Sequence, residues 1–298
     1  MYTVTVDTCV LIDLLENPDR LPLLWDKLAP RNGKLVIPYD VVCELILRHL
    51  EGSWERAEQL RNLLDQEQER AIFAAFLGDI VSAEPHIRYV PKAFQSSRPP
   101  GKSLADYIRS SKPEYEQKHS NICSQIEEYM AKDVYHSLEK DFRKKMKERS
   151  VQAQEDTEGL TVQEIMKWAY EGDYKYKDYF FSTSFWRRYV GLSKLTTPDL
   201  RYRCRLMFAM CTDMLHWGLL SPDLSGGKYN TLGTSDRNNV TDNRIAAASA
   251  YSRYLLTKDH KFKFRTNRAA GFLGLALEAV TWEEFLDRFD EGTDRRSL

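Results

Sequence analysis

The sequence predicts an α/β protein with a central parallel sheet, because short apolar strands alternate with helical patterns in two parts of the chain. Residues 1–50 show this alternation, and it returns after residue 240. The segment between them is long, charged and helical in pattern. We therefore expect one discontinuous α/β domain, made of residues 1–50 and 225–298, which is interrupted by a large α-helical insertion over 51–224.

Five elements are expected in the first 50 residues, in an order typical of a parallel sheet. β-Branched residues predict the first strand, and apolar residues at helical spacing predict the two helices after it. Asn32-Gly33 marks a turn, and Asp40 is expected to cap the helix that follows the second strand. The expected order is strand 2–6, helix 9–16, helix 20–29, strand 34–37 and helix 41–50.

The rest of the chain predicts further helices and then two more strands. An apolar stripe predicts an amphipathic helix over 121–149, and further helices are expected over 161–170 and 200–220. Residues 225–240 are expected to form a polar loop, and Thr241 is expected to cap the helix after it. The expected order from there is helix 242–252, strand 254–257, strand 275–280 and helix 282–289.

Four acidic residues fall where predicted strands end or helices begin: Asp7, Glu44, Asp242 and Asp259. Singly, such residues have simpler interpretations, as the end of a strand or as a partner for a helix dipole. Together they are more specific, because the carboxyl ends of parallel strands face one crevice where ligands bind. Carboxylates gathered there repel one another unless a cation neutralises them, and oxygen ligands select Mg²⁺ or Mn²⁺. Water bound to such an ion can attack a phosphodiester.

The segments that carry these acidic residues resemble the motifs of PIN-domain ribonucleases, a family that includes many toxin–antitoxin nucleases. The matching segments are Val6-Asp7-Thr8-Cys9-Val10-Leu11-Ile12, Ile37-Pro38-x-x-Val41-x-x-Glu44-Leu45, Asp242-x-x-Ile245-Ala246-Ala247-Ala248-x-Ala250 and Leu255-Leu256-Thr257-Lys258-Asp259. The resemblance covers residues 1–50 and 236–289. It implies a Rossmann-like α/β/α sandwich and Mg²⁺- or Mn²⁺-dependent hydrolysis of phosphodiesters, usually in RNA.

The resemblance also implies roles for individual residues. The four acidic residues would be the catalytic carboxylates, which hold the metal ion or orient the attacking water. Thr257 matches a hydroxyl that hydrogen-bonds within the acidic cluster. Cys9 stands where the family usually has asparagine, which changes the hydrogen bonds around Asp7. The insertion over 51–224 is far larger than in a compact toxin nuclease, so the toxin role is less well supported than the chemistry.

Two basic segments are candidates for nucleic-acid binding. Residues 253–268 contain six Lys or Arg residues against one acidic residue, and residues 181–210 have the same balance. Aromatic residues lie among the charges, as suits a single-stranded nucleic acid, although the aromatics alone also fit a core and the charges a solvated face. The candidate contacts are Lys258, Lys261, Lys263, Arg265, Arg187 and Arg188.

Several other classes of protein lack support in the sequence. The net charge of −1 excludes a polybasic protein, and five cysteines without a Cys-x-x-Cys pair argue against a disulfide framework or a zinc ribbon. The sequence has no phosphate-binding glycine loop, dinucleotide fingerprint, serine-hydrolase elbow or His-x-x-x-His pair. We find neither a signal peptide nor a long apolar span, and we expect a cytoplasmic protein that does not bind membranes.

We therefore expect a PIN-like endoribonuclease that acts on single-stranded RNA with Mg²⁺ or Mn²⁺ as its cofactor. The residues themselves do not separate RNA from DNA, so a structure-specific DNA nuclease stays open. A non-catalytic PIN-like module for RNA binding or assembly is the other alternative, although crowded carboxylates favour a catalyst. An antitoxin or other protein partner that docks through the helical insertion also stays open, as does a homodimer.

Overall fold

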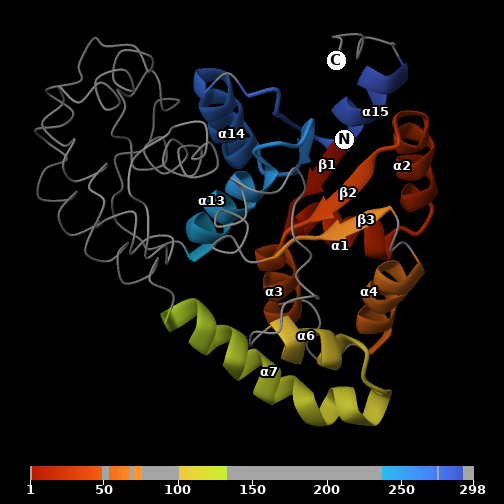
Figure 1. The fold of residues 1–298 in the computed structure, drawn as a ribbon, viewed down its shortest axis with the longest axis vertical. Coiled ribbons are helices and arrows are strands. Elements are labelled where there is room, and N and C mark those ends of the chain that lie inside the picture. Colours follow the sequence, from red (N-terminus) through yellow and green to blue (C-terminus); the bar gives the residue numbers. More distant parts are fainter. Residues whose placement is uncertain are drawn as a thin grey trace, which may run out of the picture.

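A computed structural model describes residues 2–48, 54–66, 70–75, 101–132, 237–273 and 275–290. Within them lies a parallel five-stranded sheet with the strand order β3-β2-β1-β4-β5 (Figure 1). Its strands are β1 (Thr3–Val6), β2 (Lys34–Ile37), β3 (Ala71–Phe73), β4 (Tyr254–Leu256) and β5 (Glu278–Val280). The predicted α/β class with a central parallel sheet is confirmed.

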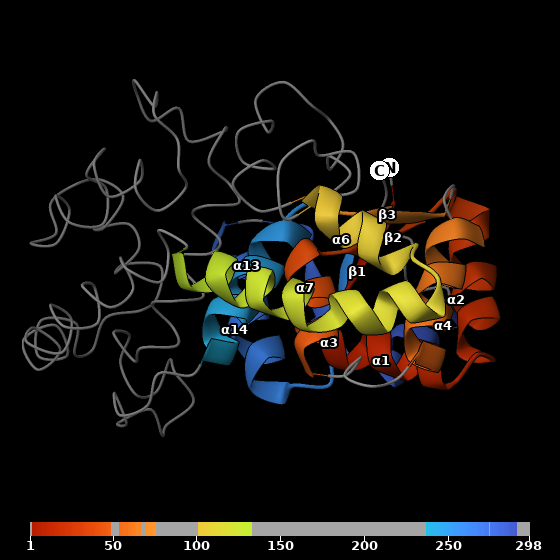
Figure 2. The same ribbon diagram turned by 90° about the horizontal axis from the view of Figure 1, so that it is seen from below.

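Helices surround this sheet in the described ranges. They are α1 (Thr8–Glu16), α2 (Arg20–Leu28), α3 (Tyr39–Arg48), α4 (Trp54–Gln66), α6 (Gly101–Ile108), α7 (Lys112–Lys132), α13 (Arg237–Ser249), α14 (His260–Leu273) and α15 (Trp282–Asp290). Helix α1 packs against α3 and α4, α13 packs against α3 and β4, and α14 packs against β5. The long helix α7 lies against α6, α3 and α4, at the bottom of Figure 1 and across the front of Figure 2.

The turn before β2 forms where the sequence predicts it. After α2, the short 3-10 helix Ala29–Arg31 ends at Asn32, whose φ of 48° is left-handed. Gly33 follows, and a Cβ atom there would lie 3.0 Å from atoms of Leu28. The turn therefore uses the tolerance of asparagine for left-handed backbone and the small size of glycine. Both predicted helices before it and the strand after it are confirmed.

Helix α3 begins earlier than predicted, so the expectation that Asp40 caps it is wrong. Asp40 lies in the first turn of the helix, and its carboxylate pairs with Arg244 of α13 at 2.9 Å. Both side chains are buried, and a buried charge requires a partner of opposite sign. This ion pair therefore joins two helices that are far apart in the sequence.

Strand β3 lies within the segment that was expected to be a largely helical insertion, and no strand was expected there. Ala71–Phe73 is buried and pairs with β2 at the edge of the sheet. Three residues are too few to show the alternation that marks a strand in a sequence. Helix α7 includes residues 121–132 of the helix expected over 121–149, and it begins earlier, at Lys112. Residues 133–149 lie outside the described residues. The helices expected over 161–170 and 200–220 lie outside the described residues.

Helix α13 begins at Arg237, within the segment that was expected to be a polar loop. Thr241 therefore lies inside the helix and does not cap it, and Asp242 lies in the second turn. Asparagines are typical of loops, but each costs a helix only ~0.7 kcal/mol relative to alanine. Neither glycine nor proline interrupts this helix. The rest of the expected loop, residues 225–236, lies outside the described residues.

The last elements follow the prediction in part. Strand β4 and helix α15 are confirmed within one residue, whereas β5 is shorter than the expected strand over 275–280. Helix α14 occupies much of the basic segment, where the sequence analysis expected no regular element. Lysines and phenylalanines alternate at the start of this helix and hide its 3.6-residue period.

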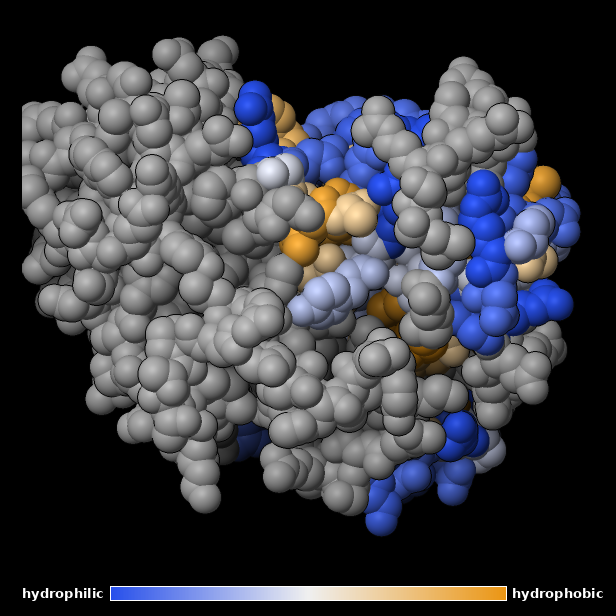
Figure 3. All heavy atoms as spheres, turned by 45° about the horizontal axis from the view of Figure 1, so that its top comes forward, coloured by the Kyte–Doolittle hydropathy of each residue, from blue (hydrophilic) through white to orange (hydrophobic). Residues whose placement is uncertain are grey.

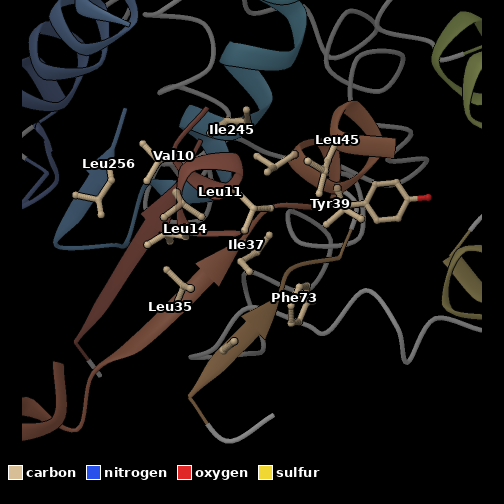
Figure 4. Packing of buried hydrophobic residues seen from close by; sticks show 14 of the residues in the cluster. Val10, Leu11, Leu14, Leu35, Ile37, Tyr39, Leu45, Phe73, Ile245 and Leu256 are labelled. Carbon is tan, nitrogen blue, oxygen red and sulfur yellow. The ribbon is translucent and has the colours of Figure 1, made fainter. Parts of the chain in front are cut away.

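The hydrophobic core fixes α1 on the sheet. Val10, Leu11 and Leu14 of α1 belong to one buried cluster with Leu35 and Ile37 of β2 (Figure 4). Complete burial of such a side chain contributes about 1.5–3 kcal/mol. Because α1 begins immediately after β1, this packing also fixes the residue that joins the two elements.

The described surface is largely hydrophilic on the face in Figure 3, with smaller hydrophobic areas between the polar ones. Leu23 and Tyr251 are the exposed large hydrophobic side chains among the described residues. The helices of the described ranges include none with the length and apolar character that a membrane span requires.

Candidate active site

Asp7 joins β1 to α1 and lies at the carboxyl end of the central strand. Its backbone N–H donates to the carbonyl of Leu256 in β4, and its side chain caps α1 by accepting from the Cys9 N–H at 2.9 Å. The Cys9 thiol also donates to Asp7 Oδ2 at 3.3 Å. Burial raises the pKa of Asp7 above its usual range, although these hydrogen bonds oppose the shift.

Thr257 connects Asp7 to the next strand of the sheet. It follows β4, is fully buried, and its hydroxyl donates to Asp7 Oδ2. The same hydroxyl oxygen accepts from the Asp259 N–H at 3.0 Å. Cys9 makes a second connection, because its Sγ accepts from the Lys258 N–H at 3.4 Å. Thr257 and Cys9 thus both hydrogen-bond to Asp7. The resemblance implies a contact of this kind for Thr257, whereas Cys9 stands where the family usually has asparagine.

Asp259 is an exposed residue that caps α14. Its Oδ1 accepts from the backbone N–H groups of Lys261 at 2.7 Å and Phe262 at 3.0 Å. Aspartate is among the best residues for this position, because its carboxylate satisfies N–H groups that have no partner within the helix. The local chemistry of helix capping therefore fixes Asp259 close to the end of β4.

Glu44 reaches the same region from the second turn of α3. Its Oε2 accepts from the Thr8 hydroxyl at 2.6 Å, and its Oε1 pairs with Arg48 at 2.9 Å. The Glu44 side chain is 16% exposed, whereas that of Arg48 is 45% exposed. Thr8 was not among the predicted site residues, although its place next to Asp7 in the first motif was a usable signal.

Asp242 completes the group from α13. Its Oδ2 lies 3.0 Å from Arg265 Nη2 of α14. Burial raises the pKa of Asp242 to about 7, and the negative charges of Asp7, Asp259 and Glu44 raise it as well, while Arg265 lowers it. The structure therefore brings the other three predicted carboxylates within electrostatic reach of Asp242. Of these, Asp7 and Asp259 follow the carboxyl ends of β1 and β4.

The oxygen atoms of the four carboxylates are the type of ligand that a hard cation prefers. In the described part of the chain, no three side chains of His, Cys, Asp or Glu lie close enough to hold a metal ion together. A magnesium ion, however, usually keeps several water ligands and is bound directly by only one or two carboxylates. Burial and mutual repulsion disfavour the ionised forms of Asp7 and Asp242, and a cation would remove this cost. The residues present thus fit a divalent ion that is bound partly through water.

The predicted basic contacts fall into two groups. Lys261 is exposed, and Lys258 is half exposed and pairs with Asp13 of α1 at 3.1 Å. In contrast, Lys263 pairs with Glu284, and Arg265 is buried beside Asp242. The expectation that Arg265 is a surface cation for nucleic acid is therefore wrong. Phe262, one of the interleaved aromatics, is also buried in the core, while Arg187 and Arg188 lie outside the described residues.

Comparisons with known proteins identify no relative of this chain. No family model matches the sequence, and no curated protein or solved structure is significantly similar to it. A function for the chain therefore has to be argued from its own residues and their geometry.

Proposed function

We propose that this chain is a PIN-like nuclease that hydrolyses phosphodiesters in single-stranded RNA and depends on Mg²⁺ or Mn²⁺. The proposal rests on one geometric observation: the Thr257 hydroxyl joins Asp7 to the backbone of Asp259, and Thr8, next to Asp7, donates to Glu44. The negative charges of Asp7, Glu44 and Asp259 also raise the pKa of Asp242. Carboxylates within electrostatic reach of one buried carboxylate carry an electrostatic cost. A bound cation would offset this cost.

The neighbouring side chains hold the carboxylates in place. Asp7 receives hydrogen bonds from Thr257 and Cys9, and Glu44 receives one from Thr8. Such contacts fix the carboxylate orientation before any ligand binds. A bound divalent ion would supply an activated water molecule and neutralise the charge that develops on the phosphate.

The positive charges beside the site support a nucleic-acid substrate. Lys258 and Lys261 flank the capping residue Asp259 in sequence, and both are exposed enough to contact a phosphate. Phosphate contacts of this kind give affinity without selecting a base sequence. RNA is the expected substrate because the matching motifs resemble those of ribonucleases, and DNA is the alternative that the assay has to address.

The first test is cleavage of a labelled single-stranded RNA in the presence of Mn²⁺. Wild-type protein should cleave it, and both EDTA and Asp7→Asn should reduce cleavage to background. Asp26→Asn, which changes an exposed carboxylate of α2, is the matched control and should keep full activity. Cleavage by Asp7→Asn at the wild-type rate would refute the proposed site.

Two further outcomes distinguish the alternatives. Faster cleavage of a DNA oligonucleotide of the same sequence would favour a DNA nuclease. No cleavage from folded protein, together with a melting temperature that Mn²⁺ leaves unchanged, would favour a non-catalytic module.

A further inference from the structure

We propose that Arg265 is a built-in counter-ion of the acidic site, and that the site consequently takes a single divalent cation. This inference rests on the proposed function, because it concerns the metal requirement of the same carboxylates. Its basis is the position of Arg265: the side chain is only 6% exposed, and its Nη2 lies 3.0 Å from Asp242 Oδ2.

Helical spacing explains why a basic residue lies inside the molecule. Phe262 and Ala269 of α14 are buried in the core, and Arg265 is three residues after the first and four before the second. Residues at this spacing share one face of a helix. Arg265 is therefore held on the buried face of α14, whereas Arg268 of the same helix is exposed.

Two of the four carboxylates of the site form ion pairs with arginines. Arg265 pairs with Asp242, and Arg48 pairs with Glu44 at 2.9 Å. Asp7 and Asp259 receive hydrogen bonds only from neutral groups, which are a hydroxyl, a thiol and backbone N–H groups. Within the described ranges, then, arginines balance two of the four negative charges, and one divalent ion would balance the two that remain.

The two arginines differ in how firmly they are held. The side chain of Arg48 is 45% exposed, so water screens its charge. Arg265 is buried, and a guanidinium group keeps its charge at every pH that a protein tolerates. A second divalent ion beside Asp242 would therefore meet a fixed positive charge. Arg265 thus occupies, in electrostatic terms, the place that a second ion would take.

The test is the number of Mn²⁺ ions bound per chain, measured by calorimetric titration and by the electron paramagnetic resonance signal of free Mn²⁺. Wild type should bind one ion. Arg265→Met removes the counter-ion and should raise the number to two. Arg265→Lys keeps the charge and should bind one, as should Arg268→Met, which changes the exposed arginine of the same helix. Circular dichroism establishes that each variant is folded.

A second variant guards against misfolding of Arg265→Met, which leaves Asp242 buried without its partner. The double variant Asp242→Asn/Arg265→Met removes both charges and should bind one ion. Two ions in wild type, or one ion in folded Arg265→Met, would overturn the inference and leave the proposed function intact. No Mn²⁺ binding to wild type would overturn both.

Discussion

Thr257→Val is the change that most directly tests how the site is held together. Valine has nearly the same shape as threonine but lacks the hydroxyl group. At this fully buried position the hydroxyl donates to the Asp7 carboxylate and accepts from the Asp259 N–H. A hydrogen bond to a charged group contributes about 1.5–3 kcal/mol, and one between neutral groups about 0.5–1.5 kcal/mol. We therefore expect the free energy of unfolding to fall by about 2–4 kcal/mol.

The assay is urea unfolding of wild type, Thr257→Val and Thr257→Ser without added metal. Serine keeps the hydroxyl and loses one buried methyl group, which costs about 1 kcal/mol. Thr257→Val should therefore be clearly less stable than Thr257→Ser, with the same dependence on urea. The reasoning fails if the valine variant is as stable as wild type, or if serine is the more damaging change.

Four other predictions concern stability, each measured by unfolding. Because the pKa of Asp242 is raised to about 7 from a usual value of 3.8, the folded state binds this proton more tightly than the unfolded state. Metal-free stability should therefore fall as the pH rises from about 4 to about 7, and Asp242→Asn should flatten that fall. Asp40→Asn leaves Arg244 buried without a counter-charge and should cost about 3–5 kcal/mol, unlike the exposed change Asp26→Asn. Gly33→Ala should cost about 1–3 kcal/mol through contact with Leu28. Gly271→Ala, where nothing lies nearby, should gain up to ~1 kcal/mol.

Strands and helices were predictable where the local pattern was long enough to show its period. The β-branched run before Asp7 and the apolar run after Gly33 became β1 and β2 as expected. β3 could not be predicted, because three apolar residues carry no period and its place depends on pairing with β2. The start of α3 was misjudged because Asp40 is a good capping residue, and only the folded chain shows that Arg244 is its partner.

The candidate site was predictable to a similar degree. Position after a strand identified Asp7 and Asp259, since the carboxyl ends of parallel strands meet in any such sheet. The positive charge of residues 253–268 indicated an exposed surface, and Arg265 was wrongly expected to lie there. Its helical spacing from Phe262 was a signal of burial, but the pairing with Asp242 depends on how α13 and α14 meet.

The order of the strands has a consequence for how this protein is made. β1 is the central strand of the sheet, yet one of its neighbours, β4, is synthesised long after it. On the ribosome, β1 and β2 emerge early, and the free edge of β1 is exposed to other nascent chains until Tyr254–Leu256 follows. Asp7 and Glu44 are therefore made well before Thr257 and Asp259. The acidic site is incomplete during synthesis, and any activity it has begins only after the late strands have paired.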